Sequence, residues 1–330
     1  MQERSDTGRL WFRVLVEGNR WALVGIMLTG VVAALVGAGL LLPQAKALFT
    51  TGDPIETVFQ AFIGATITGV TLVVTLNQLV LSQEFGAVGD QQNRMGDAID
   101  FRDDVESVLD APITPPEPAA FLQALIDVTA KRARTLREDV AADSSDDTLR
   151  DRVATLTDDV ETNADSVSDA LDGAQFGTFA VVSAAMDFDY SWKLYSARRL
   201  QAEHGGALSE AQTASLEGLI EALELYGPAR EHFKTLYFQW ALTGLSREIL
   251  AASLPSLVVS VTMVLFYDPA AVANTTLSLG VVCVSVGVAL TPFLLLLSYV
   301  LRIAMVTQRT LSIGPFTLRE NDRSDAIDWE

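Results

Sequence analysis

Four long stretches of this 330-residue chain contain no charged residue. A helix needs about 20 apolar residues to cross the hydrocarbon of a bilayer, so each stretch is long enough to span. The stretches cover residues 21–43, 57–83, 249–267 and 269–301, and the spanning part of the last begins near Thr276. We therefore predict an all-α integral membrane protein with four transmembrane helices, two within residues 21–84 and two within residues 246–303.

The first stretch also has features of a cleaved signal peptide. Arginines precede it, and Ala45-Lys46-Ala47 follows it. Its apolar part is about 22 residues long, whereas the apolar region of a signal peptide has about 7–15 residues. The length favours a retained helix.

Residues 85–245 have a different pattern, with helical periodicity and no convincing alternation of apolar and polar positions. We predict a helical-bundle domain here. Apolar residues recur in steps of four and three through one part of it, the spacing of a coiled-coil seam. The seam positions are Leu149, Val153, Leu156, Val160, Asn163, Val167 and Ala170. The predicted partner is a helix over 118–142, which forms a hairpin with this one, and Asn163 is expected to fix their register.

The ends of the other helices in this domain are predicted from glycines and prolines. We expect the second spanning helix to continue past the membrane toward Leu109, and one helix to run from Thr178 to His204. A further helix starts at Ser209 and ends near Gly227. Pro228 then opens a last helix that passes into the third span.

Lysines and arginines near the spans predict the orientation, because they gather on the cytoplasmic side. The loop at 44–56 has only Lys46, and the loop at 268–275 has neither residue type. The other side has Arg4, Arg9, Arg13, Arg20, Arg94, Arg102, Arg247, Arg302 and Arg309. We predict a multi-pass cell-membrane protein whose N-terminal segment 1–20, domain 85–245 and C-terminal tail 304–330 are cytoplasmic.

The formal net charge is −19, and residues 85–245 account for −16 of it, with 29 acidic and 13 basic residues. Aspartate is the commonest acid, and only 4 of the 23 basic residues are lysines. This composition resembles that of proteins from extreme halophiles, in which acidic surfaces stay soluble because concentrated salt screens their repulsion. The same charge argues against nucleic acid as a partner.

Few residues point to catalysis or cofactors. Cys283 is the single cysteine and lies in a charge-free stretch, and His204 and His232 are isolated from other metal-ligand residues. The sequence has no glycine-rich phosphate loop, nucleophile elbow or paired-histidine motif. We therefore expect no enzyme activity, no metal site and no cofactor.

The most informative feature is a polar stripe in the second spanning stretch. Its members are Thr68, Thr71, Thr75, Gln78 and Ser82. Steps of three and four place them on one helix face, over about 21 Å at 1.5 Å per residue. Such a face is unfavourable against lipid, so it must meet protein or water. Either the polar groups form hydrogen bonds between helices, or they line an aqueous pore in a symmetric oligomer.

The order of parts, a spanning pair, a cytoplasmic helical domain and a second spanning pair, resembles bestrophin-type anion channels over the whole chain. The resemblance implies an oligomer whose second helix lines the pore. Where that family has an aromatic gate, this chain has Thr75, Asn77 and Gln78. The leading hypothesis is an oligomeric ion channel in the lipid bilayer. The alternative is a non-transporting scaffold or sensor whose cytoplasmic domain binds a protein partner.

Overall fold

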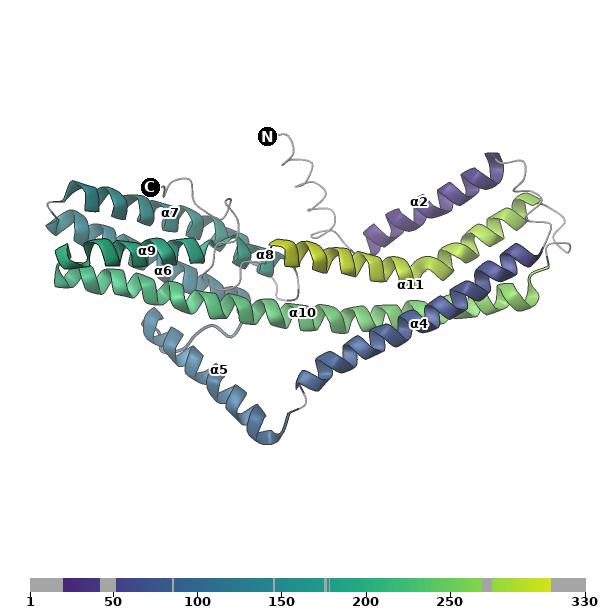
Figure 1. Cartoon of the computed structure of the whole chain (residues 1–330), viewed down its shortest axis with the longest axis horizontal. Coiled ribbons are helices and arrows are strands. Elements are labelled where there is room, and N and C mark those ends of the chain that lie inside the picture. The colour runs from purple at the N-terminus through teal and green to yellow at the C-terminus, as the bar shows by residue number, and fades with distance from the viewer. Residues whose placement is uncertain are drawn as a thin grey trace. The chain divides into compact units, whose positions relative to one another are not determined.

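The computed structural model describes residues 20–41, 52–84, 86–144, 146–174, 177, 179–268 and 275–309. These residues form helices and no strand. In chain order the helices are α2 (Arg20–Leu41), α4 (Gly52–Glu84), α5 (Val88–Leu109), α6 (Pro118–Asp143), α7 (Asp147–Leu171), α8 (Phe179–Asp187), α9 (Tyr190–His204), the 3₁₀ helix η2 (Gly205–Ala207), α10 (Glu210–Phe266) and α11 (Thr275–Arg309) (Figure 1).

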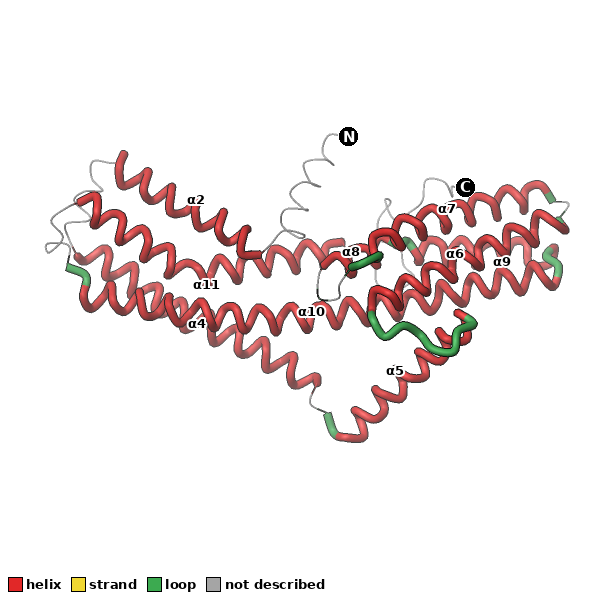
Figure 2. The backbone as a smooth tube through the Cα atoms, turned by 180° about the vertical axis from the view of Figure 1, so that it is seen from behind, coloured by secondary structure: helices red, strands yellow, loops and turns green. Residues whose placement is uncertain are grey.

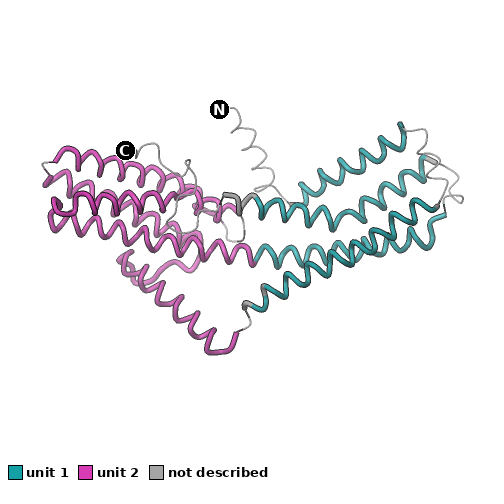
Figure 3. The backbone as a smooth tube through the Cα atoms, in the orientation of Figure 1, with its two compact units in different colours: residues 1–85, 240–306 teal, residues 86–239, 307–330 magenta. Residues whose placement is uncertain are grey.

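The chain divides into two compact units (Figure 3). Unit 1 comprises residues 1–85 and 240–306, and unit 2 comprises residues 86–239 and 307–330. The N-terminal segment, the C-terminal tail beyond Arg309 and most of the two short loops of unit 1 lie outside the described residues. The predictions made for those segments stay predictions.

Unit 1 contains the four helices that are long and apolar enough to cross a membrane. Three are α2, α4 and α11, and the fourth is the C-terminal part of α10. They share a core in which Val24 of α2, Val73 of α4, Ile249 of α10 and Leu295 of α11 are buried together. Over the described residues, the prediction of an all-helical fold with four potential spans is confirmed.

Unit 2 is built around the hairpin of α6 and α7, which pack along their lengths (Figure 2). The buried side of α7 follows the predicted seam from Leu149 to Val160 and continues through Ala164, Val167 and Leu171. Ala170 is exposed. Asp146 starts α7, because its carboxylate accepts hydrogen bonds from the backbone N–H groups of Thr148 and Leu149.

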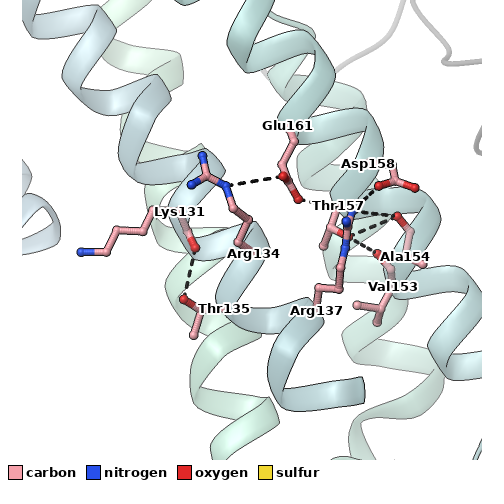
Figure 4. Close-up of polar contacts among 9 residues, drawn as sticks. All are labelled: Lys131, Arg134, Thr135, Arg137, Val153, Ala154, Thr157, Asp158 and Glu161. Carbon is pink, nitrogen blue, oxygen red and sulfur yellow. Dashed lines mark hydrogen bonds and ion pairs between the residues drawn. The ribbon is translucent and has the colours of Figure 1, made fainter. Parts of the chain in front are cut away.

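Ion pairs and hydrogen bonds join α6 to α7 beside this apolar contact (Figure 4). Arg137 Nε donates to Thr157 Oγ1 at 2.8 Å, and the same guanidinium pairs with Asp158. Arg134 and Arg137 both pair with Glu161, at 3.4 and 3.3 Å. These contacts fix how the two helices align along the hairpin.

Asn163 does not perform the register role predicted for it within the hairpin. Its Nδ2 donates to the backbone oxygen of Asp187, and its Oδ1 accepts from the backbone N–H of Asp189. These bonds hold the connection between α8 and α9. The predicted single helix over 178–204 is therefore wrong, because Asn163 takes the backbone groups of 187 and 189 and Phe188 is buried at the break.

The predicted break at Gly227 and Pro228 is absent, and α10 runs through both residues. Gly227 serves packing instead, since a Cβ there would lie 2.8 Å from Cε2 of Tyr190. Ser209 and Gln212 exchange hydrogen bonds at the start of α10, the reciprocal arrangement of a capping box. The second spanning helix was predicted to continue past the membrane toward Leu109. That prediction is wrong, because α4 ends at Glu84 and a separate helix, α5, begins at Val88.

Two polar contacts are enclosed in the core of unit 2. Tyr226 donates from its hydroxyl to the backbone oxygen of Ala185 at 2.8 Å, and burial raises the pKa of this hydroxyl. Lys193 is buried, pairs with Asp159 at 2.9 Å and lies over the ring of Phe188. A buried charge is tolerated where such a partner compensates for lost hydration.

Candidate functional site

All five residues of the polar stripe lie on α4, and all five side chains are exposed in the described structure. The structure therefore leaves Thr68, Thr71, Thr75, Gln78 and Ser82 on one uncovered face. They do not meet α10 or α11, which pack on other parts of α4.

The uncovered face extends beyond the stripe to the first turn of α4. Asp53, Thr57, Gln60 and Gly64 are exposed as well. Together with the stripe they follow steps of three and four residues from 53 to 82, so they lie on one side of the helix. We call these nine residues the polar face of α4. At 1.5 Å per residue it is about 43 Å long, more than the roughly 30 Å of a hydrocarbon core.

The opposite side of α4 makes the contacts with the rest of unit 1. Ile55, Phe59, Thr66 and Val73 are buried there. Ile55 and Phe59 pack with Met263 of α10 and with Val282 and Ala289 of α11. At about 100° per residue, this side lies roughly half a turn from the polar face. The fold of unit 1 thus turns the polar face away from its own core.

The hydroxyl groups of the polar face form hydrogen bonds within α4. Thr68 donates to the backbone oxygen of Gly64, Thr71 to that of Ile67 and Thr75 to that of Thr71, each at 2.9 Å. Thr57 and Ser82 donate in the same way, at 2.8 and 2.7 Å. None of these five bonds joins α4 to another helix. They do not provide the interhelical bonding that one interpretation of the sequence expected.

A different set of hydroxyls provides that bonding. Ser256 of α10 donates to the backbone oxygen of Ala289 of α11 at 3.1 Å, and its oxygen lies 3.4 Å from that of Thr66 on α4. Because Ser256 uses its proton on Ala289, Thr66 is the donor to Ser256. Sequence reasoning missed this site. The available signal was the spacing of Ser253, Ser256 and Ser260, which is helical and places all three on the buried side of α10.

The amides separate the polar face from an ordinary lipid-facing surface. Single exposed threonines with the same intrahelical bond occur at Thr29 on α2 and Thr262 on α10. A lone hydroxyl bonded to its own helix thus recurs on the other spans. Gln78 differs, because its exposed amide forms no hydrogen bond with the described residues. An amide left in hydrocarbon without partners is costly.

The described residues offer no group of three or more His, Cys, Asp or Glu side chains placed to hold a metal ion. Cys283 is buried in unit 1. In unit 2, His204 Nε2 lies 3.3 Å from a guanidinium nitrogen of Arg152, and His232 packs edge-on against Phe233. The contacts of the cysteine and of the two histidines are thus those of residues that pack within the fold.

The described residues define the class: they are all-helical, and their four long apolar helices indicate a membrane protein. It belongs to a family of unknown function, DUF7972, whose model matches residues 1–330. No curated protein and no solved structure matches the chain.

Proposed function

We propose that copies of this chain assemble in the membrane and that the polar face of α4 lines an ion-conducting path between them. One observation carries the proposal. The polar side of α4 is opposite its buried side, so unit 1 leaves a polar line uncovered along a helix that is apolar enough to span.

Lipid is a poor partner for this line. A single hydroxyl that bonds to its own helix is tolerable in lipid, but eight polar side chains on one face add polar area along the full thickness of the hydrocarbon. The amides of Gln60 and Gln78 are 18 residues apart, about 27 Å along the helix axis. Water or a second copy of the chain would satisfy both, whereas lipid tails satisfy neither. The topological resemblance to channels with a pore-lining second helix supports the same arrangement.

Reconstitution of the full-length protein tests this function. The mass of the detergent-solubilised protein gives the number of copies, and liposomes loaded with an ion-sensitive dye report flux. We expect a closed oligomer and ion flux above that of protein-free liposomes. A monomer that passes no ion would contradict the proposal.

A scaffold or sensor role is the second candidate, and α5 provides an observation in its favour. Val88, Met95 and Ile99 are exposed on one side of this helix, at steps of seven and four residues. An apolar line on a water-facing helix is typical of surfaces that bind another protein. A monomer without flux would leave this role as the better account.

A further inference from the structure

The direction of the hydrogen bonds on the polar face determines which ions it favours. A serine or threonine hydroxyl has one proton to donate and two lone pairs that accept. Thr57, Thr68, Thr71, Thr75 and Ser82 all donate that proton to a backbone oxygen of α4. What remains available outward on each is an oxygen with acceptor capacity only.

Gln60 also uses part of its donor capacity within α4. Its Nε2 donates to Glu56 Oε1 at 2.9 Å, which leaves the carbonyl oxygen of the amide and one N–H for other partners. The face therefore offers oxygen acceptors in nearly every turn. An anion needs N–H or O–H donors or positive charge, and this face has few donors. Oxygen acceptors instead replace the hydration shell of a cation.

Formal charge agrees with the bonding pattern. The helix contains Asp53, Glu56 and Glu84 and has no lysine or arginine between residues 52 and 84. Asp53 belongs to the polar face and is exposed. In an oligomer it would recur once per subunit around the path, and rings of carboxylates favour cations. Between Asp53 and Ser82 the face carries neutral groups only, most of them oxygen acceptors, which suits a monovalent ion better than a divalent one.

We propose that the polar face of α4 conducts monovalent cations and excludes anions. This inference rests on the proposed function, and it departs from the anion selectivity that the topological resemblance implies. The main support for cation selectivity is that five hydroxyls on this face already donate their protons to the backbone of α4. The carboxylate of Asp53 at one end of the face is a second support.

The direct test is the reversal potential of the full-length protein in a planar bilayer with a KCl gradient. We expect it to lie toward the potassium equilibrium potential. A reversal potential near zero or toward that of chloride would overturn the inference and leave the channel itself supported. Absence of any conductance would overturn the proposed function, so the two failures are distinguishable.

Asp53→Asn tests the charged end of the face. Loss of one carboxylate charge about 4 Å from a hydrated ion corresponds to roughly a fivefold change in local cation preference. The same charge repels chloride by a similar factor, so we expect the potassium-to-chloride permeability ratio to fall by at least about fivefold for each charge that acts on the ions. An unchanged ratio would remove Asp53 from the path.

Thr75→Val tests the oxygen acceptors, and Thr262→Val is its matched control. Both residues are exposed threonines on spanning helices, and both donate to the backbone oxygen four residues earlier. Valine keeps the shape and removes the oxygen. We expect lower potassium conductance in T75V and no change in T262V. Equal conductance in both variants would contradict the role of these oxygens.

Discussion

Thr75 donates its hydroxyl proton to the backbone oxygen of Thr71, 2.9 Å away on the same helix. The bond makes Thr75 independent of the other spans, and it leaves an acceptor oxygen on the side of α4 that unit 1 does not cover. Thr66, nine residues earlier, lies on the buried side and bonds Ser256. The same residue type therefore has two roles on one helix, and the roles predict different responses to substitution.

Ser256→Ala should destabilise unit 1, and Thr75→Val should not. Ser256 joins α10 to α11 and accepts from α4, so alanine removes two contacts between helices. Hydrogen bonds between spanning helices contribute about 0.6 kcal/mol on average and up to about 1.7 kcal/mol. We expect S256A to lower the free energy of unfolding in detergent by about that range. A larger loss in T75V than in S256A would show that the polar face is an internal packing surface.

Asn163→Ala should destabilise unit 2. The substitution removes both bonds to the α8–α9 connection and leaves the backbone groups of Asp187 and Asp189 without those partners. We expect a loss of about 0.5–1.5 kcal/mol for each bond, the usual net contribution of a hydrogen bond that water can partly replace. Denaturant unfolding followed by circular dichroism measures it. Thr155→Ala is the control, because Thr155 is a half-buried residue of α7 whose hydroxyl bonds within its own helix.

Gly227→Ala should also destabilise unit 2, although alanine favours helices more than glycine does. The new methyl group would lie 2.8 Å from the ring of Tyr190, over which the Arg230 guanidinium also stacks at 4.5 Å. Overpacking of this kind costs about 1–3 kcal/mol. Gly205→Ala is the matched control, since a Cβ at Gly205 meets nothing within 4 Å. Equal stability of the two variants would show that Tyr190 moves aside freely.

The ion pairs of Glu203 predict a pH dependence. Glu203 accepts a hydrogen bond from Arg199 at 2.7 Å and pairs with Arg152 of α7, and these contacts lower its pKa. A lowered pKa in the folded state contributes stability above the ordinary glutamate value of about 4.3. That contribution is lost as the pH falls through the folded-state pKa.

Glu203→Gln should therefore lower the Tm at neutral pH, and the difference from the native protein should vanish in acid. Added salt should shrink the difference as well, because the groups are partly exposed and therefore screened. Glu217→Gln serves as the control, since Glu217 is exposed and forms no ion pair with the described residues. A Tm difference for E203Q that is constant from neutral to acid pH would contradict this role of the ion pairs.

The sequence predicted the four spans and the α6–α7 hairpin well, because length and periodicity of apolar residues are properties of single segments. The predicted helix ends were wrong where they depend on contacts with another segment of the chain. The break at Phe188 involves hydrogen bonds from Asn163, and the glycine at 227 leaves room for the ring of Tyr190 inside an unbroken helix. The polar stripe was visible from spacing alone. Which side of α4 is buried required the positions of α10 and α11, and so did the roles of Thr66 and Ser256.

The central claim is that the polar face of α4 meets other copies of the chain. Cysteine cross-linking with a short bis-maleimide in native membranes tests it most directly. Cys283 is buried and can be replaced by serine, and single cysteines are then introduced as T75C and, for comparison, T262C. We predict cross-linked dimers for T75C, since one cysteine per chain can be joined to one other copy, and monomers for T262C. Monomeric T75C, or equal cross-linking of the two variants, would contradict the assembly around α4.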